Sequence, residues 1–277
     1  MNRIEDLINH TENLKVPEGR SKSEIWADLQ NKIGDDTVKS KKRFIKHPVF
    51  YYSVASTIIL FFSVLFFLSY KNTTEIFVQA GQKEKVFLPD GSEVIINSVS
   101  SLSFSTKKWE SERIVDLEGE AFFNVKKGSR FTVKCSNGTV EVKGTIFNVF
   151  SRGDVLEVKC TEGVVSVISK SGKTKHLEQN LGVKFNLDNN IGEIFSLNDS
   201  NTDLWTNGQF YFDNVNIENV FKEMERQFDI NIQFEGKTTR FFSGYFTNKD
   251  LDRALNMVCS PMSLSYEIEN ESLVVIQ

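Results

Sequence analysis

Residues 130–144 read RFTVKCSNGTVEVKG, in which apolar and polar side chains alternate on either side of the pair Asn137-Gly138. Alternation with a period of two places every second side chain of a β-strand on one face, and Asn-Gly is typical of a tight hairpin turn. The same pattern occurs in KVFLPDGSEVIIN (85–97) and DVLEVKCTEGVVSVIS (154–169), with further turn signals at Asp90-Gly91 and Ser171-Gly172. We therefore predict roughly ten or eleven short strands and no helix in residues 71–197, an all-β sandwich or solenoid-like stack.

Residues 198–208 form a polar, turn-rich linker, and after it the spacing of apolar residues is no longer a continuous alternation with a period of two. FYFD (210–213), INIQF (230–234) and FFSGYF (241–246) read as strands, and LSYEI (264–268) and SLVVI (272–276) read as a closing hairpin. Asn214 or Asn216 can cap a helix between the first two strands, and a second helix ends at Ser260-Pro261. The apolar faces of the two helices comprise Ile217, Val220, Phe221, Met224 and Phe228, and Leu251, Ala254, Leu255 and Val258. Residues 198–277 thus predict a small α+β module with the order β-α-β-β-α-β-β.

An apolar segment precedes both regions. Residues 49–70 read VFYYSVASTIILFFSVLFFLSY, without a charged side chain. At about 1.5 Å per residue, such a helix is long enough for the ~30 Å hydrocarbon core of a bilayer, so we predict a transmembrane helix at residues 48–70. Basic residues precede it, namely Lys41, Lys42, Arg43 and Lys46. The positive-inside rule then predicts a single-pass protein with residues 1–47 in the cytoplasm and everything after about residue 71 exported, which in a bacterium places the C-terminus in the periplasm.

Residues 1–47 predict two short helices separated by Pro17-Glu18-Gly19-Arg20. The first carries Ile4, Leu7 and Ile8 on one face. The second carries Ile25, Trp26, Leu29 and Ile33 within one arc, and it ends at Gly34. These faces can pack on each other or on the membrane, or the segment can fold against a partner protein with Trp26 as its anchor.

Composition excludes several classes of protein. The 277 residues include 33 basic and 37 acidic side chains, and the net charge of −4 argues against a general nucleic-acid binder. The three histidines lie too far apart in sequence to suggest a metal motif. The three cysteines are too few for a disulfide framework, and we expect buried free thiols, with a Cys135–Cys160 bridge as the alternative.

Glu118 and Glu120 flank Gly119 in a predicted strand, which would place both carboxylates on one face with their Cα atoms about 7 Å apart. That spacing is compatible with a glycosidase-like pair, but also with an exposed turn or bulge, which we favour. No nucleophile, zinc or phosphate-binding motif occurs in the chain. We expect no enzyme activity, no catalytic or metal-binding residues and no cofactor.

Several motifs carry a resemblance to a known family. LPDGSEV (88–94), LEGEAFFNV (117–125), FTV (131–133) and GTIFNV (144–149), with Asn97 and Arg113 between them, together resemble the FecR family. The residues that match its motifs, to which we assign structural roles, are Asp90, Gly91, Gly119, Glu120, Gly144, Thr145, Phe147 and Asn148. The chain departs from the family at Arg130 and Lys143, and its tail is short. Residues 198–277 resemble the module that follows FecR domains, which is akin to the short N-terminal domain of secretins and TonB-dependent receptors.

The resemblance implies an inner-membrane anti-sigma factor. Its tail, through Ile25, Trp26, Leu29 and Ile33, would bind an extracytoplasmic-function sigma factor. Its periplasmic part would receive a signal from the signalling domain of a TonB-dependent outer-membrane receptor. Two alternatives remain open: a membrane-tethered periplasmic binding or scaffold protein with an inert tail, and a periplasmic glycan hydrolase using Glu118 and Glu120.

Overall fold

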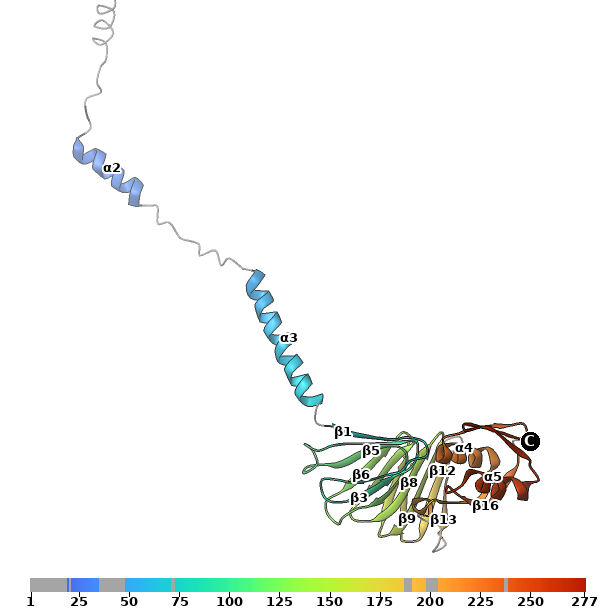
Figure 1. The fold of residues 1–277 in the computed structure, drawn as a ribbon. Coiled ribbons are helices and arrows are strands. Elements are labelled where there is room, and N and C mark those ends of the chain that lie inside the picture. The colour runs from blue at the N-terminus through green and yellow to red at the C-terminus, as the bar shows by residue number, and fades with distance from the viewer. Residues whose placement is uncertain are drawn as a thin grey trace, which may run out of the picture. The chain divides into compact units, whose positions relative to one another are not determined.

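The computed structural model describes residue 19 and residues 21–34, 48–70, 73–186, 191–197, 204–236 and 239–277. The chain, drawn in Figure 1, divides into two compact units, Met1–Phe62 and Ser63–Gln277. The predicted first helix around Ile4 lies outside the described residues, as do the basic residues 41–43 and 46.

Helix α2, Lys22–Gly34, forms where the second tail helix was predicted. The backbone N–H of Ser21 donates a hydrogen bond of 3.1 Å to Glu24 Oε2, and the Glu24 N–H bonds back to the Ser21 carbonyl. This reciprocal Ser-x-x-Glu contact satisfies donors that the first helical turn leaves without intrahelical partners.

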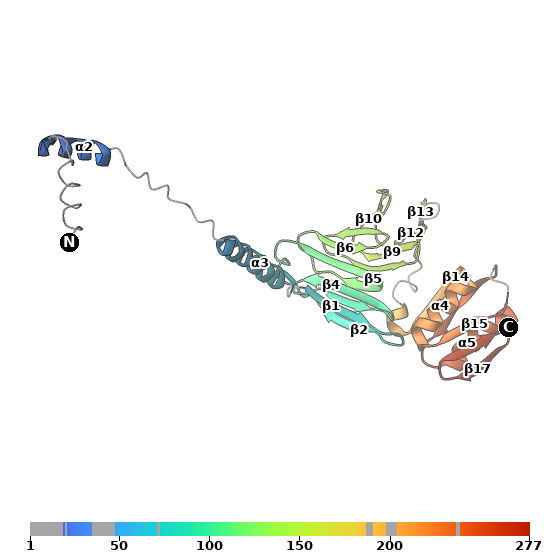
Figure 2. The ribbon, with the colours of Figure 1, turned by 90° about the horizontal axis from the view of Figure 1, so that it is seen from above.

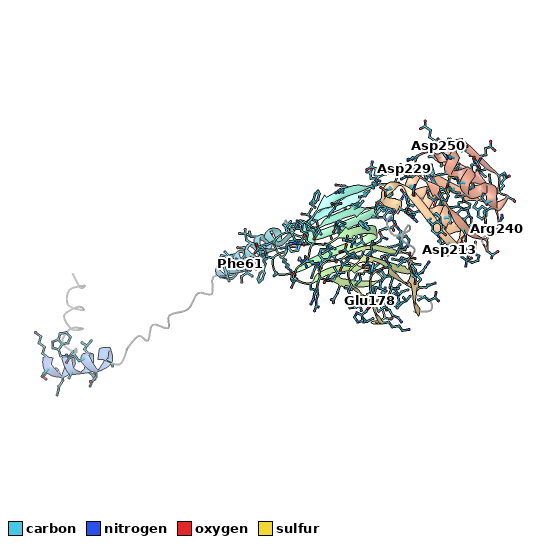
Figure 3. All side chains as sticks on the ribbon, turned by 90° about the horizontal axis from the view of Figure 1, so that it is seen from below. Phe61, Glu178, Asp213, Asp229, Arg240 and Asp250 are labelled. Carbon is cyan, nitrogen blue, oxygen red and sulfur yellow. The ribbon has the colours of Figure 1, made fainter. Side chains whose placement is uncertain are left out.

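Helix α3, Pro48–Tyr70, occupies the long apolar segment, and its described side chains, such as Phe61, are exposed (Figure 3). Among the described residues, no helix combines the length and the apolar character needed to cross a membrane. The predicted fold class is corrected on this point: the described part of the chain is mostly β, and a transmembrane helix is not shown in it.

Residues 73–196 form a β domain of thirteen described strands, more than the ten or eleven predicted. Short strands such as β2 and β11 contain four residues each, too few to show clear alternation. The strands are β1 (Thr73–Val78), β2 (Glu84–Phe87), β3 (Glu93–Ile96), β4 (Ser100–Ser105), β5 (Arg113–Asn124), β6 (Phe131–Cys135), β7 (Gly138–Val142), β8 (Ile146–Arg152), β9 (Val155–Glu162), β10 (Val165–Ser169), β11 (Thr174–Leu177), β12 (Leu181–Asn186) and β13 (Ile191–Ser196).

Strand β5 belongs to both sheets of this domain. Its first half pairs with β4 and β6, in a sheet ordered β1-β4-β5-β6-β7-β10-β11. Its second half pairs with β3 and β8, in a sheet ordered β2-β3-β5-β8-β9-β12-β13. One apolar core includes side chains of both sheets, with Phe123 and Phe147 stacked at 5.0 Å between ring centroids. The arrangement is the sandwich among the predicted alternatives.

Residues 204–277 form the C-terminal module, coloured orange to red in Figure 2. Its elements are η1 (Leu204–Asn207), β14 (Gln209–Asn216), α4 (Ile217–Phe228), β15 (Asn231–Phe234), β16 (Phe241–Thr247), α5 (Leu251–Cys259), η2 (Ser260–Met262), β17 (Tyr266–Asn270) and β18 (Leu273–Ile276). The predicted order of strands and helices is confirmed. Strand β14 pairs with β16, while β18 pairs with β15 and β17.

The two helices of the module present the predicted faces to its core. Ile217, Val220, Phe221 and Met224 of α4 are buried, as are Ala254, Leu255 and Val258 of α5. Of the two candidate N-caps for α4, the structure selects Asn216, whose side-chain oxygen accepts from the Glu218 N–H at 2.9 Å.

Candidate functional site

The β domain and the C-terminal module meet at a buried carboxylate. Glu120 lies just after the point where β5 changes sheets, and only 8% of its surface is exposed. Its two oxygens accept separate hydrogen bonds, from Asn97 Nδ2 at 2.8 Å and from Asn148 Nδ2 at 2.9 Å. We call Asn97, Glu120 and Asn148 the amide socket.

Each asparagine of the amide socket also accepts a hydrogen bond from the C-terminal module. Gln227 Nε2, on α4, donates to Asn97 Oδ1 at 2.9 Å. Trp205 Nε1, in η1, donates to Asn148 Oδ1 at 3.0 Å. All four of these side chains are buried, so the two contacts are protected from competing water.

Further polar contacts surround these two bonds. Gln227 Nε2 also donates to Glu223 Oε1 at 2.9 Å, and Glu223 forms an ion pair of 2.5 Å with Arg226. Ser98 Oγ bonds to the Gln82 carbonyl at 2.6 Å, which fixes the residue that follows Asn97. Ile95 and Phe122 of the β domain pack against the apolar core of the module. The interface thus combines apolar burial with a connected hydrogen-bond network.

Arg152 supports the socket from β8. Its guanidinium donates to the carbonyls of Ser98 and Val99 at 2.6 and 2.7 Å, and to Ser100 Oγ at 3.0 Å. Ser100 Oγ in turn accepts the Glu120 N–H at 3.1 Å. Arg152 thereby ties the turn that carries Asn97 to the strand that carries Glu120.

The socket carboxylate has a perturbed acidity. Burial raises the pKa of Glu120, and the nearby Glu223 carboxylate raises it further. The amides of Asn148 and Asn97 and the charge of Arg152 lower that pKa and so offset part of the increase. Burial also lowers the pKa of Arg152, against the opposing effect of Glu223. These groups therefore interact electrostatically across the module boundary.

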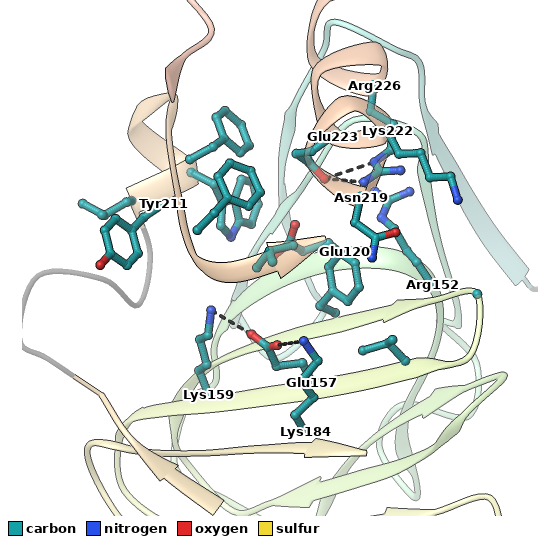
Figure 4. A pocket seen from close by; sticks show the side chains of 18 of the residues that line it. Glu120, Arg152, Glu157, Lys159, Lys184, Tyr211, Asn219, Lys222, Glu223 and Arg226 are labelled. Carbon is teal, nitrogen blue, oxygen red and sulfur yellow. Dashed lines mark hydrogen bonds and ion pairs between the residues drawn. The ribbon is translucent and has the colours of Figure 1, made fainter. Parts of the chain in front are cut away.

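A cleft of about 650 Å³ opens beside this network (Figure 4). On its β-domain side, Glu157 lies between Lys159 at 2.9 Å and Lys184 at 3.6 Å. The two lysines lower the pKa of the Glu157 carboxyl despite its burial, which alone raises it. The other wall comes from η1, β14 and α4 and includes Trp205, Tyr211, Asn219, Lys222, Glu223 and Arg226. Because both modules line the cleft, any relative movement would change its shape.

The remaining family-motif residues hold the β domain together. Asp90 and Gly91 form the turn between β2 and β3, and Asp90 pairs with Arg113 at 2.9 Å. Thr145 Oγ1 donates to the Val164 carbonyl at 3.1 Å, and Phe147 is fully buried. A Cβ on Gly144 would lie 2.6 Å from the Cα of Lys127, so the residue must lack a side chain.

The predicted sigma-binding residues lie on α2. Ile25, Trp26 and Leu29 are 51%, 64% and 42% exposed, so they form an apolar stripe open to a partner. The side chain of Ile33 lies outside the described residues. Their role as a binding site stays a prediction.

Glu118 and Glu120 do not form a carboxylate pair on one face. Gly119 has a φ of +103°, and the alternation of buried and exposed side chains along β5 is interrupted at this residue. As a result, Glu118 is exposed while Glu120 is buried. Among the described residues, no group of three or more His, Cys, Asp or Glu side chains could hold a metal ion. Cys135, Cys160 and Cys259 are free thiols, and burial raises their pKa values to about 12, 11 and 11.

Sequence reasoning missed the module's half of this interface. Trp205 was placed in a polar linker, whereas it is 8% exposed and bonds to Asn148. A single tryptophan within NDSNTDLWTNG was the available signal, because a large aromatic side chain in an otherwise polar segment commonly marks an anchor. Gln227 lies 130 residues from Asn97, and no local pattern reveals that contact.

Comparisons with known proteins agree with this architecture. Residues 74–166 match the family model described as FecR protein, and residues 209–275 match the one described as FecR, C-terminal. Two crystal structures of a candidate anti-sigma factor from Parabacteroides distasonis, at 2.50 and 1.65 Å resolution, are similar to the chain with a TM-score of 0.69 each. They are 27% and 28% identical in sequence, and the similarity covers 74% of this chain and 98% of theirs. No protein of curated function matches. With both of its modules matched in order, the chain belongs to the FecR family.

Proposed function

We propose that this chain is an anti-sigma factor, a regulator that relays a signal from its β domain and C-terminal module to a sigma factor bound by its N-terminal tail. The observation that carries the proposal is the match of both modules to FecR models, together with the likeness to a candidate anti-sigma factor. A regulatory role also fits the chemistry of the described residues, whose buried polar groups connect modules rather than surround a reactive side chain.

Helix α2 supplies the output surface in this proposal. Ile25, Trp26 and Leu29 are exposed, and a helix with such a stripe can bind in an apolar groove of a partner. Trp26 is the expected anchor, because tryptophan side chains dominate the binding energy of many interfaces. The partner is an extracytoplasmic-function sigma factor, and the input is the signalling domain of a TonB-dependent outer-membrane receptor.

The proposed location is the bacterial inner membrane, with the tail in the cytoplasm and both modules in the periplasm. Its support is the excess of basic residues before residue 48 in the sequence. Protease added to spheroplasts should remove a tag placed after Gln277 and leave a tag placed before Met1 intact. Protection of both tags, or removal of the N-terminal tag alone, would contradict this location.

Transcript profiling tests the regulatory proposal. Deleting the chain should change the expression of a defined group of genes, and Trp26→Ala should reproduce at least part of that change because it removes the anchor of the sigma contact. Asn31→Ala is the matched control and should behave as wild type, because Asn31 is exposed on α2 and lies on the side of the helix opposite the apolar stripe. Identical transcripts in the deletion strain and the wild type, with and without an inducing signal, would count against the proposal.

A further inference from the structure

The amide socket has an internal logic that depends on the chemistry of Glu120. An ionised carboxylate has acceptor atoms only, whereas an asparagine amide has an NH₂ donor group and one acceptor oxygen. Because Asn97 and Asn148 both donate to Glu120, both must turn their NH₂ groups toward it. Their oxygen atoms therefore point away from Glu120.

The C-terminal module meets those two oxygens with donors. The indole N–H of Trp205 is a donor only, and Gln227 places its NH₂ group at Asn97 Oδ1. If either asparagine amide reversed, an NH₂ group would face another N–H group in a buried site, and both donors would lose their partners. The orientation set by Glu120 is therefore the one that lets the module bind.

We propose that Glu120 is a positioning residue that locks the C-terminal module to the β domain, by holding Asn97 and Asn148 in the orientation that accepts Gln227 and Trp205. The lock makes the two modules move as one body. This next step rests on the proposed function. The lock transmits a displacement of the C-terminal module to the rest of the chain, so a variant with a weakened lock should not relay the signal.

The test is Glu120→Gln in the full-length protein, with Glu118→Gln as the matched control. The substitution keeps the size of the side chain but adds a donor, so one of its two contacts can form only if an asparagine amide reverses. Glu118 lies two residues away on the same strand and is exposed. Circular dichroism should show that both variants keep the wild-type fold.

Cleavage by chymotrypsin after Trp205 reports on the lock, because this side chain is buried and bonded to Asn148 while the two modules are joined. When opening is fast relative to cleavage, the cleavage rate is proportional to the fraction of molecules in which the two modules have separated. The loss of hydrogen bonds at the amide socket should increase that fraction, and with it the cleavage rate, about tenfold in Glu120→Gln. Glu118→Gln should be cleaved at the wild-type rate. Wild-type cleavage of a folded Glu120→Gln protein would overturn the lock.

Trp205→Phe supplies a second, independent variant. It removes the indole N–H while keeping an aromatic ring, and it tests the lock even if Glu120→Gln fails to fold. Because Trp205 and Glu120 both act through Asn148, the double variant should be cleaved less than the product of the two single effects predicts. A Trp205→Phe protein cleaved at the wild-type rate, or strictly multiplicative effects, would refute the coupling.

Reporter transcription separates the lock from its role in signalling. In cells, Glu120→Gln should lose the response to the inducing signal, while Glu118→Gln responds as wild type. Faster cleavage with an unchanged response would leave the lock standing and refute its part in the relay. A cleavage rate equal to that of wild type would refute the lock, whatever the transcriptional response. Neither result bears on the separate proposal that α2 binds a sigma factor.

Discussion

Gly119 is the residue at which β5 passes from one sheet to the other, and two features exclude a side chain there. Its φ of +103° lies in the region that L-residues rarely adopt. A Cβ would also lie 2.4 Å from Ser100 Oγ and 2.9 Å from Ser100 Cα. Ser100 Oγ is the atom that accepts the Glu120 N–H, so a shift at Gly119 would reach the amide socket.

Gly119→Ala should therefore destabilise the protein by about 2–5 kcal/mol, the sum of the positive-φ cost and the cost of overpacking. Gly153 is the matched control, because its φ is +52° but no atom lies within 4 Å of an added Cβ. Gly153→Ala should cost only about 1–2 kcal/mol. Urea unfolding followed by circular dichroism measures both, and equal losses of stability would contradict the steric account.

At the scale of elements, Asp90 and Arg113 fasten the β2–β3 turn to the start of β5. Arg113 is 7% exposed, and its guanidinium also donates to the carbonyls of Lys126 and Ser129. Burial by itself raises the pKa of Asp90, but the Ser92 N–H and the Arg113 guanidinium lower it, and the net pKa lies below the ordinary value of 3.8. The ion pair therefore joins three segments of the sandwich.

Asp90→Asn should destabilise the protein by about 2 kcal/mol at neutral pH, because it leaves a buried guanidinium without its carboxylate. A depressed pKa gives a contribution that is present above the unfolded value and lost as pH falls through the folded value. The stability difference between wild type and Asp90→Asn should thus be constant from pH 7 to 5 and shrink below 3.8.

Urea midpoints at pH 7, 5 and 3.5 measure this difference. Glu93→Gln is the control, since Glu93 pairs with Lys85, whose side chain is 51% exposed, and such pairs contribute little. A difference between wild type and Asp90→Asn that is equally large at all three pH values would show that the charge of Asp90 has no part in it.

The elements themselves were largely predictable, because burial on one face imposes a period that the sequence displays. The faces of α4 and α5 and the order of the C-terminal module follow from such periods. The alternation of buried and exposed side chains did not predict the structure at Gly119. There a positive φ interrupts the alternation, so that Glu118 is exposed and Glu120 is buried. The amide socket could not be predicted, because Asn97 and Asn148 lie 23 and 28 residues from Glu120.

At the scale of the whole molecule, the β domain and the C-terminal module form one unit joined by the amide socket, Trp205 and Gln227. The motif residues Glu120 and Asn148 thus serve the contact between modules as well as the β domain. The exposed apolar stripe of α2 is a separate feature, to which we assign the binding of the sigma factor. The two are linked only through the function that we propose for the chain.

Cross-linking of the full-length, tagged chain in its native cells, followed by mass spectrometry, tests directly whether helix α2 binds a sigma factor. Lys22 and Lys32 are exposed at the two ends of α2 and offer amines to the cross-linker. We predict cross-links from these lysines to an extracytoplasmic-function sigma factor, which are lost with Trp26→Ala and retained with Asn31→Ala. Recovery of intact protein with no sigma factor, or with as much of it from Trp26→Ala as from wild type, would contradict the account.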